Sequence, residues 1–223
     1  MKSVIITGAG SGLGKELALL FARQGLHTIL TGRTLDKLQS VEQEIREAGG
    51  SAEVHTLDIT KTKEISKLMT QIQDHELYGL LNNAGVGHFG PFNSLSEQDI
   101  QEMFDTNTLG TIHMTQAILP FLKEKNEGLL MNIISTAGLK GKVNESVYVA
   151  SKFAVRGFTE SLQKELENTN IKVKAVYMGG MDTPFWDESD HIKDKSRLRS
   201  PKEVAEMILD HMEDDSIVIE SKK

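Results

Sequence analysis

The sequence has no cysteine, a single tryptophan and no long hydrophobic run. Without cysteine there is no disulfide framework, no thiolate nucleophile and no cysteine-ligated metal site, a composition that suits a reducing compartment. The apolar stretch 17–22 near the amino terminus is far shorter than the roughly 20 residues needed to cross a bilayer, and the residues before it lack the pattern of a signal peptide. We therefore expect a cytoplasmic protein that does not associate with membranes.

Clustered histidines and an excess of basic residues are also missing. The two histidines nearest to each other in the sequence, His75 and His88, are thirteen residues apart, so no neighbouring pair indicates a metal site. The 25 basic residues are outnumbered by 32 acidic ones, and the net charge of −7 repels phosphate backbones and anionic lipids. These features predict no metal site, no nucleic-acid partner and no membrane partner.

What the sequence does contain is a regular alternation of short apolar runs with longer amphipathic segments. The 223 residues, 39% of them hydrophobic, are enough for one domain with a sizeable core. Strands are predicted at 4–7, 27–31, 52–55, 79–81, 129–134, 171–177 and 217–219, and helices at 12–24, 35–48, 61–74, 96–123, 146–169 and 200–213. We therefore predict a single α/β domain over residues 1–223, a Rossmann-type doubly wound parallel sheet of about seven strands with helices on both faces.

One segment, 178–199, shows no clear period and is long for a loop inside a compact domain. Loops of that length are usually functional or mobile. We predict that this segment is a lid over the substrate site.

The first predicted strand leads into a glycine-rich turn, T-G-A-G-S-G-L-G at 7–14, and a helical pattern follows at once. A turn of this kind between a strand and a helix lets the backbone approach a pyrophosphate and directs the helix N–H groups at it. The spacing is G-x3-G-x-G rather than the commoner G-x-G-x-x-G. The assignment of a dinucleotide site therefore depends on the position of the turn between strand and helix as much as on its glycine spacing. The turn predicts a dinucleotide site, with a purely structural turn as the alternative.

The choice of cofactor depends on Arg33, which follows the second predicted strand. In NAD-binding sites a carboxylate about twenty residues beyond the glycines binds the ribose 2′-hydroxyl. A guanidinium at that place instead fits a 2′-phosphate. The sequence therefore predicts NADP(H). Arg33 as a solvated loop charge is the alternative, and Lys15 is the other candidate for reading the phosphate.

Four further features follow in order along the chain: N-N-A-G at 82–85, Asn107, Ser135, and Tyr148 with Lys152 in a Y-x3-K pattern. Each alone has an ordinary explanation, such as a cap, a strand end, a core aromatic or a surface charge. Together with the T-G-x3-G-x-G turn they resemble the classical short-chain dehydrogenase/reductase family over nearly the whole chain. The resemblance implies an oxidoreductase whose catalytic residues are Asn107, Ser135, Tyr148 and Lys152. It implies cofactor contacts at Gly8, Ser11, Gly12, Leu13, Gly14, Arg33, Asp58, Ile59, Asn83, Ala84, Tyr148, Lys152, Met181 and Thr183.

The pair Tyr148 and Lys152 also has a physical rationale. Residues at i and i+4 share one helix face, so the Lys152 ammonium can lie near the Tyr148 phenol and lower its pKa from the ordinary value near ~10. Tyr148 would then protonate the carbonyl oxygen of a substrate while the nicotinamide hydride attacks the carbon, and Ser135 would hydrogen-bond the same oxygen. By resemblance, Asn107 would hold a water that links Lys152 to solvent.

The sequence departs from the family after the sixth predicted strand. Where family members carry Pro-Gly, this chain has Met178 and Gly179, while Thr183 still matches the threonine that contacts the carboxamide. Because proline's fixed φ is lost there, we expect a freer turn at the start of the lid. The chain also ends soon after the seventh strand, which leaves little of it for the family's C-terminal tetramer contacts. We expect a homodimer or a homotetramer.

Substrate walls are predicted in the loops 86–92 and 136–147 and at Phe185 and Trp186, whose apolar character suggests a small ketone or aldehyde. The basic lid residues could instead meet an acyl-carrier protein, or form a solvated face with the acids between them; they are Lys193, Lys195, Arg197 and Arg199. The predicted function is therefore NADPH-dependent reduction of a carbonyl compound, with Tyr148 as general acid. The alternatives are a 3-oxoacyl-(acyl-carrier-protein) reductase and a non-catalytic NADP-binding sensor or scaffold, which would not need the catalytic set.

Overall fold

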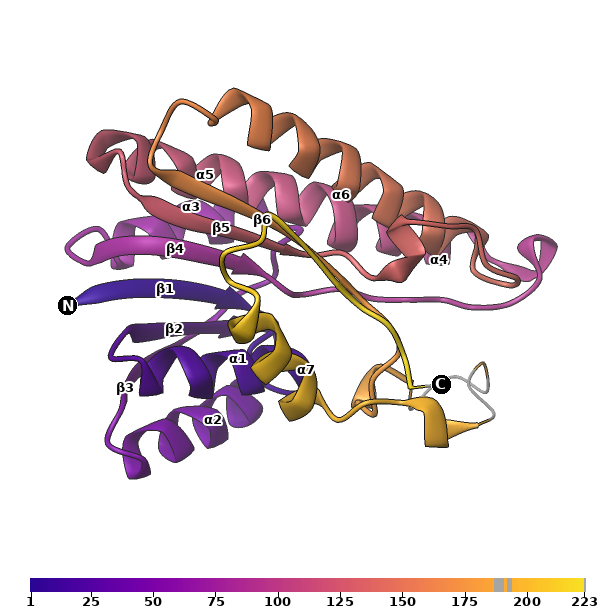
Figure 1. Cartoon of the computed structure of the whole chain (residues 1–223), viewed down its shortest axis with the longest axis horizontal. Coiled ribbons are helices and arrows are strands. Elements are labelled where there is room, and N and C mark those ends of the chain that lie inside the picture. The colour runs from indigo at the N-terminus through magenta and orange to yellow at the C-terminus, as the bar shows by residue number, and fades with distance from the viewer. Residues whose placement is uncertain (187–190, 192–193, 223) are drawn as a thin grey trace.

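The computed structural model describes residues 1–186, 191 and 194–222, and a seven-stranded parallel sheet runs through its centre (Figure 1). The strands are β1 Lys2–Thr7, β2 His27–Gly32, β3 Ser51–Thr56, β4 Glu76–Asn82, β5 Gly128–Ile133, β6 Ile171–Met178 and β7 Ser216–Ile219. Their order across the sheet is β3-β2-β1-β4-β5-β6-β7, with every neighbouring pair parallel. The predicted doubly wound sheet is confirmed, and the order reverses between β1 and β4, where such sheets place their ligand crevice.

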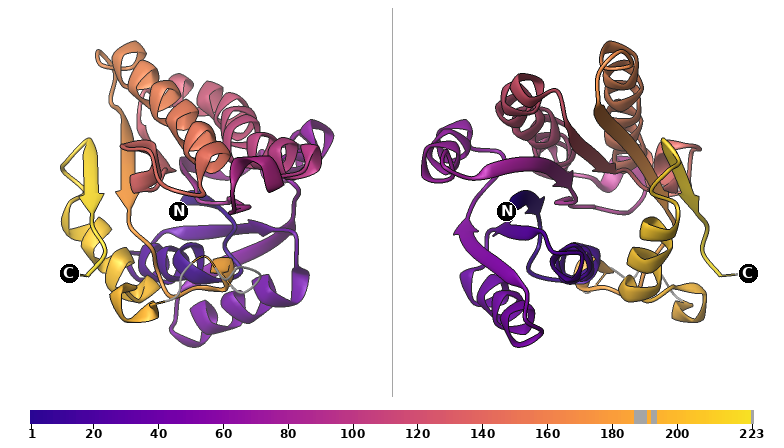
Figure 2. Two further views of the ribbon diagram at one scale, coloured as in Figure 1. Left: turned by 90° about the vertical axis from the view of Figure 1, so that its right-hand side faces the viewer. Right: turned by 60° about the vertical axis from the view of Figure 1, so that its left-hand side comes forward.

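Helices cover both faces of this sheet in two layers (Figure 2). The helices are α1 Gly12–Arg23, α2 Leu35–Glu47, α3 Thr62–Gln71, α4 Glu97–Met103, α5 Thr111–Lys125, α6 Ser146–Glu165 and α7 Pro201–Asp210. Successive strand residues point to opposite faces, so Val4 and Ile6 of β1 pack with α1, α2 and α7, whereas Ile5 packs with α3, α5 and α6. Burial on both faces explains why β1 reads as one continuous apolar run.

The predicted helix over 96–123 is wrong in one respect, because the structure divides it. Helix α4 begins with a capping box, in which Ser96 and Asp99 bond each other's backbone N–H groups. A π-helical turn, Phe104–Gly110, then separates α4 from α5. A π-turn differs from an α-turn by a single residue, so the apolar spacing of the sequence does not reveal it. Asn107 lies in the middle of this turn, and such turns occur often at functional sites.

A buried polar network ties the two central strands to the helices above them. The Asn82 amide nitrogen donates to Asn132 at 2.9 Å and to Thr115 of α5 at 3.0 Å. The Asn132 amide in turn donates to Thr159 of α6 at 2.8 Å. These side chains are almost fully buried, so their hydrogen bonds replace some of those that water would have made, while Oδ1 of Asn82 has no partner among the described residues. The network links β4 and β5 to α5 and α6, and the N-N-A-G segment continues directly from Asn82.

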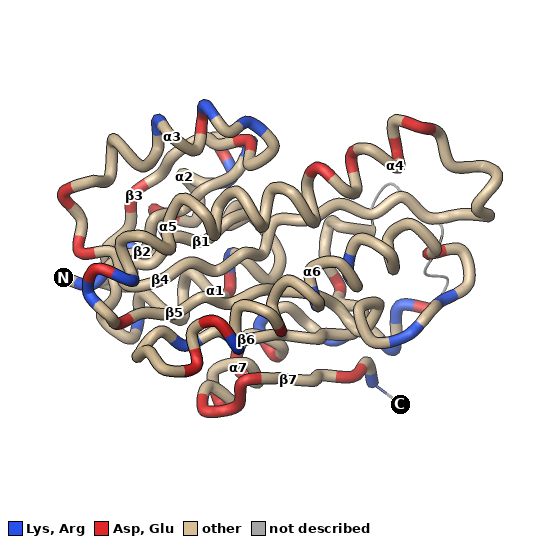
Figure 3. The backbone as a smooth tube through the Cα atoms, turned by 90° about the horizontal axis from the view of Figure 1, so that it is seen from above, with Lys and Arg blue, Asp and Glu red and all other residues tan. Residues whose placement is uncertain are grey.

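The surface carries charges of both signs (Figure 3). Acidic residues gather in the turn between α7 and β7, at Glu213, Asp214 and Asp215. Within the described residues, no helix combines the length and the apolar character that crossing a membrane requires.

Candidate functional site

A cleft lies where the central strands reach their carboxyl ends, and it gathers residues from distant parts of the sequence. Its walls include all the cofactor and catalytic residues predicted from the sequence except Gly14 and Asn107, namely Gly8, Ser11, Gly12, Leu13, Arg33, Asp58, Ile59, Asn83, Ala84, Ser135, Tyr148, Lys152, Met181 and Thr183. Parallel strands bring all their carboxyl ends to one edge of the sheet. The topology therefore assembles this cleft.

At the floor of the cleft, the glycine turn leads from β1 into α1. Gly8 has φ 65°, a left-handed conformation that suits glycine. A Cβ on Gly14 would collide with the Gly8 carbonyl oxygen, so Gly14 serves the close packing of helix against turn rather than lining the cleft. The first turn of α1 has no acidic residue, and its N-cap Ser11 makes no side-chain cap bond. These helix N–H groups face the cleft without a side-chain anion, an arrangement that fits the pyrophosphate of a dinucleotide.

Asn83 braces the same turn from the neighbouring strand. Its amide nitrogen donates to the carbonyl oxygens of Thr7, at 3.0 Å, and Gly8, at 3.2 Å. The Thr7 hydroxyl oxygen in return accepts from the backbone N–H groups of Asn83 and Ala84, each at 3.0 Å. The N-N-A-G segment thus holds the glycine turn in place as well as lining the cleft.

Two basic residues were candidates for reading a cofactor phosphate, and the structure separates them. Arg33 lines the cleft with a side chain 66% exposed, and its only recorded ionic contact among the described residues is a long one of 3.9 Å to Glu102. Lys15 is not among the lining residues and pairs with Glu44 at 2.6 Å. Arg33 is therefore exposed at the cleft with only a long ion pair, which leaves it the better candidate for a 2′-phosphate, whereas Lys15 is held by a short one.

Asp58 lies beside Arg33 in the cleft wall. Burial raises the pKa of the Asp58 carboxyl, but hydrogen bonds from the Thr60 hydroxyl and backbone, at 2.7 and 2.9 Å, outweigh it and hold the pKa below its ordinary value. Asp58 is thus a fixed, ionised group, with its two hydrogen bonds to Thr60 setting its orientation.

The predicted catalytic side chains meet where β5 and α6 come together. Tyr148 and Lys152 lie on one face of α6, and each is only 5% exposed. Ser135 follows β5 with φ 96°, an unusual conformation for a residue other than glycine, and it hydrogen-bonds Tyr148. The Lys152 ammonium donates to the Ile133 carbonyl at 3.2 Å and lies 5.7 Å from the centre of the Tyr148 ring.

The electrostatics of this group differ from the prediction. Burial raises the pKa of Tyr148, and the charge of Glu145 raises it further, while the hydrogen bond with Ser135 lowers it. Burial also lowers the pKa of Lys152 to about 8. The expected net lowering of the Tyr148 pKa is therefore wrong: the pKa stands above its ordinary value, because desolvation disfavours the charged form of the phenol. Tyr148 is held as a neutral phenol, the form that can donate a proton.

Asn107 takes a supporting position behind the cleft wall. Its side-chain oxygen accepts from the Val86 N–H at 2.8 Å, and its amide nitrogen donates to the Val86 carbonyl at 2.9 Å and to Ser151 at 3.0 Å. The side chain thus ties the segment after β4 to α6, the helix that carries Tyr148. The water-holding role implied by the family resemblance stays a prediction.

Aromatic side chains form the wall beside Tyr148. Phe89 packs edge-on against the Tyr148 ring at 5.4 Å and stacks on Trp186 at 5.0 Å. Phe185 lies 6.0 Å from the Tyr148 ring. The predicted walls at 86–92 and at Phe185 and Trp186 therefore come together around the tyrosine.

Sequence reasoning missed one acidic group in this wall, Glu145. Its side chain is only 8% exposed, lines the cleft, and lies 2.9 Å from His191 and 3.8 Å from Lys142. The signal was available, because Glu145 stands immediately before α6 and only three residues before Tyr148. The pocket is therefore polar at one point as well as aromatic.

The predicted lid, 178–199, is described in part, because residues 187–190 and 192–193, including Lys193, lie outside the described residues. Its two ends meet where Met181 bridges Arg199, and the Trp186 indole N–H donates to the Met181 carbonyl at 3.0 Å. A Cβ on Gly12 would lie 3.1 Å from the Thr183 methyl group. The segment thus starts directly over the glycine turn.

Comparisons with known proteins agree with this architecture. The family model for short chain dehydrogenase matches residues 2–194. Sepiapterin reductase of Chlorobaculum tepidum is 33% identical over 213 residues, which cover 91% of this chain and 86% of that protein.

Two solved structures extend the likeness to the fold. A short-chain dehydrogenase from Sphingobium yanoikuyae in complex with NADPH superposes with a TM-score of 0.90 at 25% identity, covering 99% of this chain and 87% of that one. Actinorhodin polyketide ketoreductase with NADPH, carrying a phenylalanine-to-tryptophan substitution, gives a TM-score of 0.89 at 28% identity, covering 98% of this chain and 95% of that one. With its glycine turn, its N-N-A-G segment and its Ser-Tyr-Lys group assembled at one cleft, this chain belongs to the short-chain dehydrogenase family of oxidoreductases.

Proposed function

We propose that this protein is an NADP(H)-dependent carbonyl reductase, which converts a small ketone or aldehyde to an alcohol with Tyr148 as the proton donor. The observation that carries the proposal is the meeting of Ser135, Tyr148 and Lys152 in the same cleft that Arg33 and the first turn of α1 line. A module that only binds the cofactor would need Arg33 and the first turn of α1 but not Ser135, Tyr148 and Lys152.

The chain's own groups account for cofactor binding. When bound, NADPH supplies the hydride. The N–H groups of the α1 N-terminus, which have no side-chain cap, suit its pyrophosphate, and the exposed guanidinium of Arg33 suits its 2′-phosphate. The NADPH complexes of two solved relatives support this assignment.

The proton comes from the Tyr148 hydroxyl. Because burial keeps that phenol neutral, it can donate a hydrogen bond to a carbonyl oxygen and then release its proton as negative charge develops there. Ser135, already hydrogen-bonded to Tyr148, stabilises the same charge. Lys152, when protonated, supplies a positive charge near the phenolate that remains, and so limits the cost of the transfer.

The cleft favours a small substrate over a carrier-protein thioester. Of the basic lid residues that could meet an acidic carrier protein, Arg199 is paired with Glu203 and Arg197 donates to the Lys222 carbonyl at 3.3 Å. The aromatic side chains of Phe185 and Trp186, which line the cleft, instead suit a flat or apolar carbonyl compound. The names of two relatives, sepiapterin reductase and polyketide ketoreductase, also describe reduction of carbonyl compounds.

The test is NADPH oxidation with a panel of ketones, aldehydes, diketones and 3-oxoacyl thioesters, run on the wild type and on Tyr148→Phe. The variant keeps the aromatic ring and loses only the proton donor, so turnover should fall by about 100-fold or more while NADPH still binds. If Tyr148→Phe keeps more than a tenth of the wild-type activity, Tyr148 is not the proton donor. NADPH binding without turnover on any member of the panel would favour the sensor, and selective use of carrier-protein thioesters would favour the alternative reductase.

A further inference from the structure

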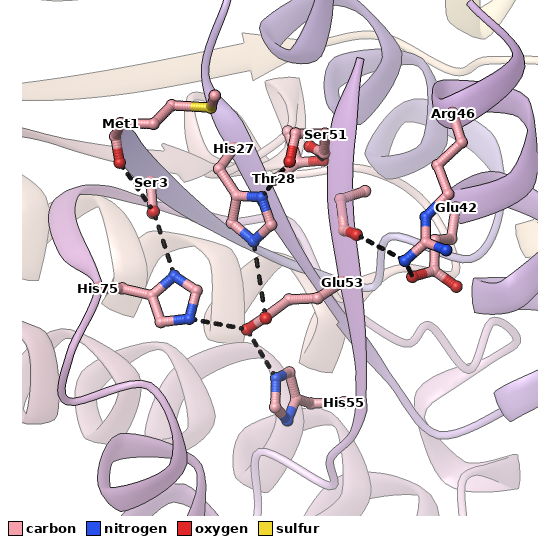
Figure 4. Close-up of polar contacts among 11 residues, drawn as sticks. Met1, Ser3, His27, Thr28, Glu42, Arg46, Ser51, Glu53, His55 and His75 are labelled. Atoms are coloured by element: carbon pink, nitrogen blue, oxygen red, sulfur yellow. Dashed lines mark hydrogen bonds and ion pairs between the residues drawn. The ribbon is translucent and has the colours of Figure 1, made fainter. Parts of the chain in front are cut away.

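Three histidines and a glutamate meet beside the amino-terminal ends of β2 and β4 (Figure 4). His27 opens β2, Glu53 and His55 lie on β3, and His75 comes immediately before β4. In the sequence these residues are far apart, which is why no metal site was predicted from neighbouring histidines. The parallel sheet places the amino-terminal ends of β2 and β4 close to side chains of β3, so residues distant in the sequence meet.

The cluster is organised around one carboxylate. The Glu53 oxygens lie 2.9 Å from Nε2 of His55, 3.5 Å from Nε2 of His75 and 3.7 Å from Nε2 of His27. The rings of His27 and His75 stack with their centroids 5.2 Å apart. One ligand atom each from His27, Glu53 and His75 lie within 4.8 Å of one another. Two imidazoles therefore direct the same ring nitrogen at one acidic group.

Neighbouring serines can engage Nδ1 of both rings and leave Nε2 available to an ion. The Ser3 hydroxyl lies 3.4 Å from the Met1 carbonyl and 3.4 Å from Nδ1 of His75, so it can accept from Nδ1–H while donating to the carbonyl. Nδ1 of His27 lies 2.7 Å from the Ser51 hydroxyl, which can accept in the same way. A second partner on the far nitrogen commonly fixes the tautomer of a metal-binding histidine.

This tautomer leaves an electrostatic conflict. With Nδ1 carrying the proton, each Nε2 directs a lone pair toward the carboxylate of Glu53, and Nε2 of His27 is buried with no hydrogen-bond partner among the described residues. A cation between the nitrogens and the carboxylate would remove this conflict.

We propose that His27, Glu53 and His75 form a binding site for one divalent transition-metal ion of the zinc class, remote from the catalytic cleft. Two imidazole nitrogens with one carboxylate oxygen make a donor set that zinc accepts, whereas magnesium and calcium prefer oxygen alone. Metal–ligand bonds of about 2.0–2.2 Å require the side chains to close only slightly.

His55 completes the site as a positioning residue. It lies against the same Glu53 oxygen that faces His75 and so orients the carboxylate. The side chains are between 15% and 31% exposed, so an ion can reach them from solvent. A bound ion would tie β2, β3 and the segment before β4 together, which makes its expected effect one on stability rather than on the reaction.

The experiment uses full-length protein made without a polyhistidine tag, stripped with a chelator and titrated with zinc chloride by calorimetry. We expect one zinc per chain and a higher melting temperature with zinc but not with magnesium. His27→Gln and His75→Gln should each weaken binding by about tenfold or more. His211→Gln is the matched control, because His211 is exposed at the end of α7, away from the cluster, and this variant should bind as the wild type does.

A second measurement needs no variant and protects the test against misfolding. In wild-type protein with 15N-labelled imidazoles, zinc should shift the Nε2 resonances of two histidines and leave their Nδ1–H tautomer in place. Failure of the wild type to bind zinc saturably would overturn the proposal, as would wild-type affinity in the His27→Gln, His75→Gln double variant. Retention of the hydrogen-bonded cluster in the NMR spectra without any zinc-dependent shift would show that the cluster is a purely structural ion-pair network.

Discussion

At the scale of single residues, Tyr148 shows how burial sets the direction of acid–base chemistry. Its phenol is desolvated, and the nearest acidic group named above, Glu145, disfavours the phenolate further. Both effects raise the pKa of Tyr148, and only the hydrogen bond with Ser135 opposes them. The residue is therefore suited to give a proton to a substrate rather than to take one.

Glu145→Gln should move the pH dependence of carbonyl reduction. Removing the negative charge lowers the pKa of Tyr148, and reduction requires the protonated phenol, so the loss of kcat at alkaline pH should begin at a lower pH than in the wild type. The measurement is kcat against pH at saturating NADPH. Glu160→Gln, an exposed change further along α6, is the control and should leave the profile in place. An alkaline limb that stays fixed or moves to higher pH in Glu145→Gln would contradict this account.

Lys152→Met should abolish activity but raise the free energy of unfolding. The pKa of Lys152 falls from 10.5 to about 8 on folding, so below pH 8 the folded protein holds a buried charge at a cost of about 3 kcal/mol. We expect the variant to gain about 2 kcal/mol in free energy of unfolding at pH 7, since the hydrogen bond to Ile133 is also lost, and to lose turnover.

The sign of this effect can be checked with pH. Between about 8 and 10.5 the unfolded chain binds the proton more tightly than the folded one, so the wild type gains stability as pH rises through that range. The advantage of Lys152→Met, measured by urea unfolding, should therefore shrink from pH 7 to pH 10. Lys164→Met, exposed on the same helix, should change stability by no more than about 0.5 kcal/mol. A constant difference across the pH range would mean that Lys152 is not the group responsible.

Arg33→Asp should weaken NADPH binding by about 2 kcal/mol, roughly thirtyfold, because attraction to the 2′-phosphate becomes repulsion. NADH should be affected less or bind better. Dissociation constants for both cofactors give the answer. Lys15→Gln serves as the control and should leave the preference unchanged, since Lys15 is held by Glu44. An NADPH preference that survives Arg33→Asp would assign the phosphate to another residue.

At the scale of elements, the segment after β6 links the glycine turn to the substrate wall. Thr183 lies against Gly12, and Trp186 stacks on Phe89 next to Tyr148. Trp186 is the single tryptophan, so its fluorescence reports on this segment alone. The segment therefore connects the glycine turn to the aromatic side chains beside Tyr148, and a change in its position can be followed by Trp186 fluorescence.

Binding of NADP⁺ should change the emission maximum of Trp186 or its accessibility to a quencher, and a product analogue should change it further, because contact with Thr183 would reposition the segment. NADP⁺ is used since reduced cofactor absorbs where tryptophan emits. Free N-acetyltryptophanamide with the same NADP⁺ controls for direct quenching. If saturating NADP⁺ and analogue leave the Trp186 signal unchanged, the segment is an ordered loop and its role as a lid is rejected.

At the scale of the whole molecule, the cleft joins strands and helices from both halves of the chain, so a ligand there should stabilise the entire fold. At about 100 times its dissociation constant, a ligand adds about 2.7 kcal/mol to the free energy of unfolding, which for a protein of this size corresponds to a rise in Tm of about 5–10 °C. We expect NADP⁺ to give such a shift in the wild type and in Tyr148→Phe, and NAD⁺ at the same concentration to give a smaller one. Equal shifts from both cofactors would contradict the role of Arg33. The homodimer or homotetramer expected from the family stays a prediction, which light scattering would test.

Much of the site could be predicted from the sequence because its residues sit at fixed places in local elements. Ser11 and Gly12 stand where a helix begins, and Tyr148 and Lys152 lie one helical turn apart. Asn107 was located correctly in the chain, but its contacts with Val86 and Ser151 depend on a π-turn that the apolar pattern does not show. Glu145 was missed because its importance comes from burial beside Tyr148, and burial depends on the packed wall.

The sequence by itself determined the alternation of strand and helix, the glycine turn and the one-turn spacing of Tyr148 and Lys152, because each depends on spacing along a few neighbouring residues. Only the tertiary structure decided the direction of the Tyr148 and Lys152 pKa values and the meeting of His27, Glu53 and His75. Desolvation and long-range contact are properties of the space around a side chain. The surroundings of a side chain form when strands distant in the sequence pair side by side, so the residue pattern along a short stretch of chain cannot predict them.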